Sequence, residues 1–152
     1  MALEISSSAF SEGGLIPPSY TCDDQDVSPD LTWTGIPEGT KTLALICDDP
    51  DAPVGTWVHW VLFNIPPGEN GLRSNIAPEA ELSYGARHGK NDFGKLGYGG
   101  PCPPGGTHRY FFKLYALDTT LELQSGATKA QVEAAMEGHI IDETQLMGKY
   151  KR

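Results

Sequence analysis

The stretch that most constrains the fold is residues 48–64, in which a rigid acidic turn leads into a strongly β-forming run. The turn carries Pro50 and Pro53, and each proline fixes φ and removes a backbone donor. The run after it contains His59 among tryptophan, valine and phenylalanine residues, which favour strands. We therefore expect this run to pair with residues 42–47, an apolar segment that would be covered on both faces.

Length and composition indicate a single, mainly β domain over residues 1–152. A chain of this length is the size of one domain, and its 39% hydrophobic residues are enough to build a core. The 18 glycines and 12 prolines favour a loop-rich β architecture over a helical bundle. Strands are predicted near residues 3–10, 31–33, 42–47, 57–64, 108–117 and 144–150.

One or two short helices are expected near the C-terminus, and one of them has a defined start. Thr128 and Gln131 match a capping box, in which each side chain accepts a hydrogen bond from the other residue's backbone N–H. Val132 and Met136 follow at helical spacing, and Gly138 is a candidate end. The pattern predicts a short amphipathic helix that begins after Thr128.

The charge balance excludes functions that need a basic surface. The formal net charge is −9 and no basic stripe is present, so we expect no nucleic-acid partner. No apolar run is as long as a membrane span, and the N-terminus lacks the basic and apolar regions of a signal peptide. We expect a cytoplasmic protein with no stable membrane insertion.

The cysteines argue against a disulfide framework. Cys22, Cys47 and Cys102 are odd in number and lack C-x-x-C spacing, which also argues against a structural zinc site. Cys102 is interpreted as an unreactive loop cysteine, with an exposed reactive thiol as the alternative, because no neighbouring Lys or Arg would lower its pKa. We expect no metal and no cofactor.

One constellation has the chemistry of an anion site. His108 and Tyr110 share a face of a predicted strand, directly after a glycine-rich loop over residues 85–106. With Asp49 and His59 they would offer a carboxylate, two imidazoles and a phenol, which are the parts for holding a small oxyanion. We give equal weight to the alternative that these histidine and tyrosine side chains only pack in the sheet and bind no ligand.

Alternation places His59 on the strand face of Trp57, Val61 and Phe63. Two histidines and one aspartate also suit zinc or non-haem iron, which we rank below the anion interpretation. The loop near Gly100 has almost the spacing of a phosphate-binding P-loop, but it lacks the lysine and the following helix, so nucleotide binding is rejected.

Two segments of the chain resemble a known family. Residues 49–53 and 57–66 resemble the first signature of the phosphatidylethanolamine-binding protein family, and residues 100–101 with 105–110 resemble the second. The ending over residues 138–150 is similar to the bacterial and archaeal branch, often labelled Raf kinase inhibitor-like proteins. The resemblance implies an antiparallel Greek-key β-sandwich, a pocket for phosphate-bearing headgroups, and a binding or regulatory role.

The resemblance also assigns residues to the pocket and implies a cis bond between Ala52 and Pro53. Val58 replaces a second histidine of eukaryotic relatives, and Cys102 lies in a loop that usually reads proline–lysine–glycine. Kinase inhibition is not carried over. The matching ligand-binding residues are Asp49, Ala52, Pro53, Trp57, His59, Gly100, Pro101, His108 and Tyr110.

Three functions are therefore weighed. The first is a protein that binds a small phosphorylated or other oxyanionic ligand. The second is a hydrolase or other enzyme that uses Asp49 with His59 or His108 as an acid–base pair. The third is a homodimeric interaction protein with a vestigial pocket and an exposed apolar surface, such as one around Trp33.

Overall fold

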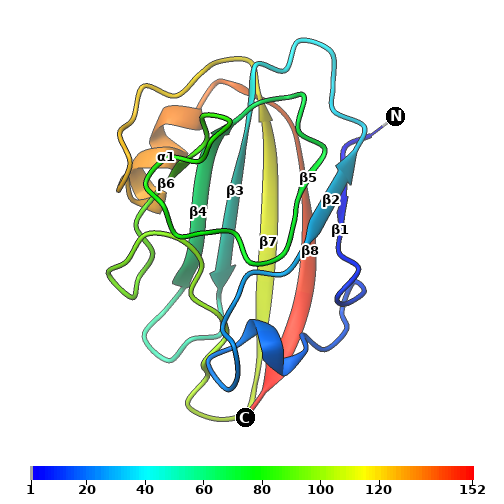
Figure 1. Ribbon diagram of the computed structural model, residues 1–152, viewed down its shortest axis with the longest axis vertical. Coiled ribbons are helices and arrows are strands. Elements are labelled where there is room, and N and C mark those ends of the chain that lie inside the picture. The colour runs from blue at the N-terminus through cyan, green and yellow to red at the C-terminus, as the bar shows by residue number, and fades with distance from the viewer. Residues whose placement is uncertain (1) are drawn as a thin grey trace.

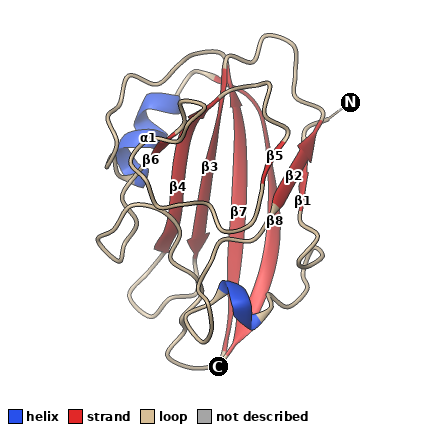
Figure 2. Cartoon of the chain, in the orientation of Figure 1, coloured by secondary structure: helices blue, strands red, loops and turns tan. Residues whose placement is uncertain are grey.

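The computed structural model describes residues 2–152, and it is mainly β, with antiparallel pairing within both sheets and one α-helix (Figures 1 and 2). The α-helix lies near the C-terminus as predicted, whereas the one 3-10 helix lies near the N-terminus. The elements are β1 (Glu4–Ser6), η1 (Pro18–Tyr20), β2 (Leu31–Thr34), β3 (Thr42–Asp49), β4 (Trp57–Ile65), β5 (Gly71–Leu72), β6 (Arg87–His88), β7 (Thr107–Leu117), α1 (Lys129–Met136) and β8 (Ile140–Lys151).

The strands form two sheets that enclose the main core. The small sheet has the order β1-β2-β5, and the large sheet has the order β6-β4-β3-β7-β8. Trp33 of the small sheet belongs to the same buried cluster as Trp60 and Phe112 of the large sheet. On the other face of the large sheet, Val132 and Met136 of α1 complete a second cluster. The large sheet is thus the middle layer of the molecule.

The centre of the large sheet agrees with the sequence. All eight residues of β3 are buried, because β3 lies between two strands and both of its faces are covered. Leu45 pairs with Leu62 of β4 and with Leu114 of β7, and both pairings are antiparallel. The prediction that residues 42–47 pair with the strand after the acidic turn is confirmed.

A β-bulge changes the direction of His59. Cys47 pairs with Trp60, but the next residue, Asp48, pairs with Val58, so His59 is an extra residue on its strand. The prediction that His59 shares a face with Val61 and Phe63 is therefore wrong. Those two residues pack under α1, whereas His59 contacts the ring of Tyr110 on the opposite face. Bulges commonly re-aim a side chain in this way.

The helix start is confirmed in detail. Thr128 Oγ1 accepts from the backbone N–H of Gln131 at 3.2 Å, and Gln131 Oε1 accepts from the N–H of Thr128 at 3.0 Å. The helix ends at Met136, and Gly138 follows with a φ of 81°, a left-handed conformation that suits glycine. The capping box satisfies two backbone donors that the first helical turn leaves free.

The terminal strands differ in length from their predictions. The first strand stops at Ser6, and beyond it Ser8 donates both its backbone N–H and its hydroxyl to the carboxylate of Asp30 and not to a neighbouring strand. The last strand is longer than predicted and spans Ile140–Lys151, because it pairs along the whole of β7.

The apolar surface expected around Trp33 does not exist. Trp33 is 1% exposed, and its indole N–H donates to the carbonyl of Glu69 at 2.9 Å. Trp33 therefore provides no exposed apolar surface for a partner, and the homodimer stays a prediction. Within residues 2–152, no helix is both long enough and apolar enough to cross a membrane.

Candidate ligand-binding site

A cavity of about 230 Å³ lies where β3, β4 and β7 meet the acidic turn and the glycine-rich loop, at the end of the molecule that carries the C-terminus (Figure 1). Seven of the nine predicted residues line it, namely Asp49, Ala52, Pro53, Trp57, His59, His108 and Tyr110. Five further lining residues were not predicted, namely Val54, Phe93, Cys102, Pro103 and Pro104.

Asp49 and His108 form a buried pair at the base of the cavity. Asp49 ends β3, His108 is the second residue of β7, and His108 Nδ1–H donates to Asp49 Oδ2 at 2.6 Å. The other oxygen, Asp49 Oδ1, accepts from the backbone N–H of Asp51 at 2.7 Å. Because a carboxylate only accepts, the proton of this pair lies on Nδ1, and Nε2 of His108 is left for other partners.

His59 is held by the glycine-rich loop. Its Nδ1–H donates to the carbonyl of Gly99 at 2.6 Å. Burial lowers the pKa of His59 below its usual value, and the Gly99 carbonyl and the charge of Asp49 only partly offset that effect. His59 is therefore neutral at pH 7, and its Nε2 is an acceptor.

Tyr110 supplies a hydrogen-bond donor without a partner. The side chain is buried, and its hydroxyl bonds to no group among residues 2–152. Its ring meets the ring of His59 edge-on, with centroids 5.2 Å apart, and stacks with that of His108 at 6.5 Å. Burial raises the pKa of Tyr110, so the phenol keeps its proton and can donate. A buried donor left unpaired costs about 1–3 kcal/mol, so this position favours an acceptor from a ligand or a water.

An ion pair fixes the acidic turn to β7. Arg109 donates from Nε and Nη2 to the two carboxylate oxygens of Asp51, each at 2.8 Å, and its backbone N–H donates to Oδ2 at 3.0 Å. The side-chain hydrogen bonds of Arg109 lower the pKa of Asp51 to about 2. Sequence analysis missed this pair, although Arg109 lies next to His108 and Asp51 lies two residues after Asp49.

Phe93 closes one side of the cavity. Its ring meets the rings of Trp57 and His59 edge-on, at centroid distances of 5.6 Å and 5.4 Å. Val54 lies at the rim and is 86% exposed. Phe93 could not be found from the sequence, because it lies in a loop whose residues show no periodicity.

The predicted cis bond is wrong. The structure has no cis peptide bond within residues 2–152, so the bond between Ala52 and Pro53 is trans. The chain reverses through Gly55, which has a φ of 109° and donates its N–H to the carbonyl of Ala52 at 3.1 Å. Ala52 and Pro53 nevertheless line the cavity as the resemblance implied.

Gly100 and Pro101 lie outside the lining. Gly100 N–H donates to Asp26 Oδ1 at 2.8 Å, and the carbonyl of Pro101 accepts from the N–H of Cys22 at 3.1 Å. A side chain at position 100 would collide with the backbone of Tyr20, so this close approach requires glycine. Both residues hold the loop behind the cavity.

The expectation against a disulfide is wrong. Cys22 and Cys102 are bonded across 80 residues of sequence, and Cys47 is the free, buried cysteine that makes the count odd. Neither interpretation of Cys102 as a free thiol holds. Spacing could not reveal the bond, because the two loops meet only through the fold. Disulfides are typical of oxidising compartments and of hyperthermophile proteins, so a cytoplasmic location stays a prediction.

The metal interpretation gains no geometric support. Within the described residues, no three His, Cys, Asp or Glu side chains are arranged as metal ligands. Nδ1 of His108 is occupied by Asp49, and Nδ1 of His59 is occupied by Gly99. The arrangement is a small cavity that offers one phenol donor, two imidazole Nε2 atoms and an aromatic rim.

Comparison with known proteins identifies the family. The family model described as "Phosphatidylethanolamine-binding protein" matches residues 6–151. A UPF0098 protein of Methanothermobacter thermautotrophicus is 54% identical over 150 residues, which cover 99% of both chains. A UPF0098 protein of Aquifex aeolicus is 48% identical over 153 residues, covering 99% of this chain and 89% of the relative.

Solved structures give the same result. A putative phosphatidylethanolamine-binding protein homologue from Chlamydia trachomatis superposes with a TM-score of 0.92 at 40% identity, covering 99% of this chain and 98% of the other. YbcL of E. coli, described as a member of the mammalian family, gives 0.91 at 34% identity, covering 100% and 99%. The chain therefore belongs to the phosphatidylethanolamine-binding protein family.

Proposed function

We propose that this protein binds a small oxyanion, of the kind that a phosphate monoester presents, in the cavity between His59, His108 and Tyr110. The observation that carries the proposal is that Tyr110 lines the cavity while its buried hydroxyl has no partner in the described chain. An oxyanion would accept from this hydroxyl and remove the cost of leaving it unpaired.

The two histidines define which form of the anion fits. Neutral His59 offers Nε2 as an acceptor, and Nε2 is the nitrogen that His108 leaves for a ligand, as an acceptor in the neutral ring or as a donor in the cationic ring. The cavity lining contains no Lys or Arg. The guanidinium of the nearby Arg109 is hydrogen-bonded to Asp51 and does not line the cavity. The favoured anion therefore carries a proton on one oxygen, which it donates to His59 Nε2 while another oxygen accepts from the Tyr110 hydroxyl. A phosphate monoester with a single negative charge meets this requirement.

The rim favours an organic substituent on the anion. Trp57, Phe93 and Val54 present apolar surface beside the cavity, and the two aromatic rings are in edge-on contact. A phosphate ester would place its anionic group near Tyr110 and its substituent against these side chains. The relative from Chlamydia trachomatis is described as a putative phosphatidylethanolamine-binding protein homologue, which agrees with this class of ligand.

Isothermal titration calorimetry tests the proposal with two probes, inorganic phosphate and phosphoethanolamine. We expect the wild-type protein to bind both in the millimolar range or more tightly, and His108→Ala to bind more weakly. If neither probe binds the wild-type protein at about 10 mM, a concentration near the weak end of specific affinities, the proposal is wrong.

A second candidate function is acid–base catalysis, and the hydrogen bond of 2.6 Å between Asp49 and His108 favours it. A carboxylate that orients an imidazole is a common part of such enzymes. A screen of phosphorylated and acyl substrates would use Asp49→Asn as its control. Turnover that persists unchanged in this variant would show that the pair is not catalytic.

A further inference from the structure

Asp48, the neighbour of Asp49, faces the opposite side of the large sheet. It is 1% exposed, and its Oδ2 accepts from Lys113 Nζ at 3.1 Å and from Lys129 Nζ at 2.9 Å. Lys113 comes from β7 and Lys129 from the start of α1, so the cluster joins three elements. We call these three residues the Asp48 cluster.

The other oxygen of the Asp48 carboxylate has no partner. Asp48 Oδ1 is buried and accepts no hydrogen bond within residues 2–152. A buried acceptor of this kind is costly, and a carboxylate oxygen requires a donor. The two lysines do not supply it, because both ammonium groups bond to Oδ2. The cluster therefore lacks one donor.

A cavity of about 280 Å³ opens on this cluster. The Lys113 and Lys129 side chains are 29% and 21% exposed, so the ammonium groups can be approached from solvent. Phe111 offers an apolar wall. The cavity is lined by Asp48, Pro50, Thr56, Phe111, Lys113, Lys129 and Gln145.

Charge and geometry define the missing partner. One carboxylate and two ammonium groups leave a single positive charge, in a chain whose net charge is −9. Both ammonium nitrogens lie within 3.1 Å of one oxygen, so one small anionic group can contact both. The same ligand must present a donor to Asp48 Oδ1. A monoanion with an adjacent hydroxyl matches the charge better than a zwitterion, which carries no net charge.

We propose that the Asp48 cluster is a second binding site, on the opposite face of the sheet from the oxyanion cavity, and that its ligand is a small 2-hydroxycarboxylate. The carboxylate would contact Lys113 and Lys129, the hydroxyl would donate to Asp48 Oδ1, and the carbon chain would lie against Phe111. This proposal does not depend on the function proposed for the Tyr110 cavity.

The test is a nuclear magnetic resonance titration of the full chain with lactate, propionate and alanine. Lactate should shift the amide signals of Asp48, Lys113 and Lys129 in a saturable manner. Propionate, which lacks the hydroxyl, should bind at least about tenfold more weakly, because it leaves Asp48 Oδ1 unpaired. Alanine, a zwitterion, should also bind more weakly than lactate.

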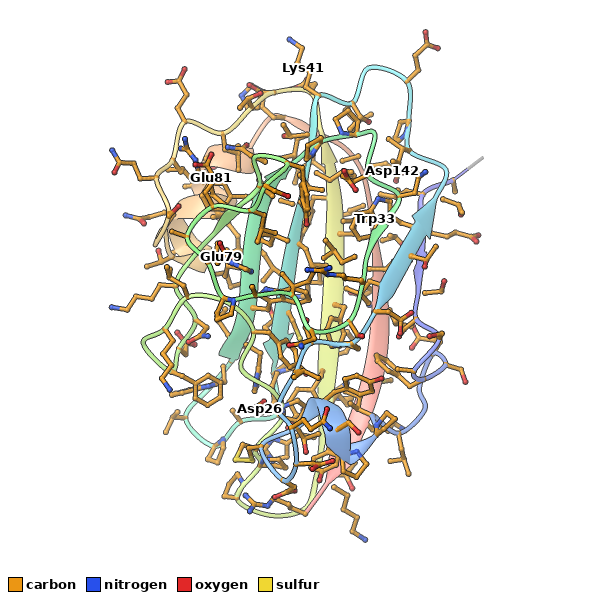
Figure 3. All side chains as sticks on the ribbon, viewed as in Figure 1. Asp26, Trp33, Lys41, Glu79, Glu81 and Asp142 are labelled. Carbon is orange, nitrogen blue, oxygen red and sulfur yellow. A yellow bond between two sulfur atoms is a disulfide. The ribbon has the colours of Figure 1, made fainter. Side chains whose placement is uncertain are left out.

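Two lysine variants make the test specific. Lys129→Met should abolish the lactate shifts, whereas Lys41→Met, which removes the same charge from an exposed position at the far end of the molecule, should keep them (Figure 3). Lys113→Met provides a second variant if Lys129→Met does not fold. Equal affinities for lactate and propionate, shifts that persist in both cluster variants, or the absence of any shift would each overturn the proposal. Shifts centred on His108 would overturn it too, because they would place lactate in the other cavity.

Discussion

His108 Nδ1 and Asp49 Oδ2 are 2.6 Å apart, and both side chains are buried, although 59 residues separate them in sequence. The contact joins the end of β3 to the start of β7, so it positions the acidic turn and the second strand of the cavity together. It also determines which nitrogen of His108 is free. Several properties of the protein depend on this contact and its neighbours.

Replacement of Asp49 should destabilise the fold. Asp49 accepts hydrogen bonds from His108 Nδ1–H and from the backbone N–H of Asp51. Asp49→Ala removes both acceptors and leaves these two donors unpaired where little water reaches them. We expect the free energy of unfolding to fall by about 3 kcal/mol, as measured by urea denaturation. Asp24→Ala is the matched control, because Asp24 is exposed, and it should change stability little. Equal effects of the two substitutions would show that the hydrogen bonds of Asp49 do not stabilise the fold.

The buried histidines should make the protein sensitive to mild acid. Burial lowers the pKa of both His59 and His88 in the folded state. The unfolded chain binds protons below its histidine pKa of about 6.5, whereas the folded chain does so only at lower pH. The stabilisation is therefore complete above about pH 6.5 and is lost as the pH falls through the folded pKa values.

Urea midpoints measured across this pH range check the prediction. His59→Gln should make the decline of stability with falling pH shallower, because one titrating group is removed. His139→Gln is the comparison variant, because it removes a histidine from an exposed position, where its Nδ1 lies 2.8 Å from Asp118 Oδ1. A slope that is the same in all three proteins would show that His59 does not titrate as described.

The Arg109–Asp51 pair should be sensitive to the shape of the cation. The two side-chain donors of Arg109 reach both oxygens of Asp51, which lysine cannot reproduce. In Arg109→Lys, the pKa of Asp51 should rise from about 2 toward the ordinary value of about 3.9. Stability from this pair is present above the unfolded pKa and is lost as the pH falls toward 2, so the variant should lose less in acid.

Carbon-detected titration of the Asp51 carboxyl measures this shift. Arg87→Lys is the control, because the contacts of Arg87 are with other groups, namely Glu81 at 3.8 Å and the carbonyl of Leu123 at 2.8 Å. It should leave the Asp51 pKa unchanged. An Asp51 pKa near 2 in Arg109→Lys would mean that the forked hydrogen bonds are not its cause.

Reduction of the disulfide should lower stability substantially. The bond between Cys22 and Cys102 closes a loop of 80 residues of sequence separation, for which chain entropy gives a stabilisation of about 4 kcal/mol. Dithiothreitol should shift the urea midpoint of the wild-type protein by a corresponding amount. It should have no effect on the double variant Cys22→Ala/Cys102→Ala. A wild-type midpoint that does not respond to the reductant would contradict the prediction.

Local patterns predicted six of the eight strands within residues 2–152 and part of the site, but they missed β5 and β6, each only two residues long, and β6 lies in the segment that was expected to be a loop. His108 and Tyr110 were placed correctly on one face, because β7 alternates without interruption between buried and more exposed residues from Thr107 to Ala116. Thr128 and Gln131 identified the helix start, because a capping box is complete within four residues. The Greek-key connection implied by the family resemblance stays a prediction.

The remaining features depend on contacts between distant segments. The bulge at His59 is determined by the register between β3 and β4, which alternation within one strand does not reveal. The partners of Cys22 and of Asp51 lie on other elements and follow only from the assembled fold. Phe93 reaches the cavity from a loop, where no periodic pattern indicates which side chains line a cavity.

The most direct test of the oxyanion site compares two tyrosine variants by calorimetry with phosphoethanolamine. Tyr110→Phe removes the unpaired hydroxyl in the cavity, and Tyr84→Phe removes another buried, unpaired hydroxyl that lies outside it. We predict that Tyr110→Phe weakens binding about tenfold, the value of one hydrogen bond to a charged group, and that Tyr84→Phe leaves it unchanged. Equal affinities of Tyr110→Phe and the wild-type protein would contradict the proposal that the Tyr110 hydroxyl binds the anion.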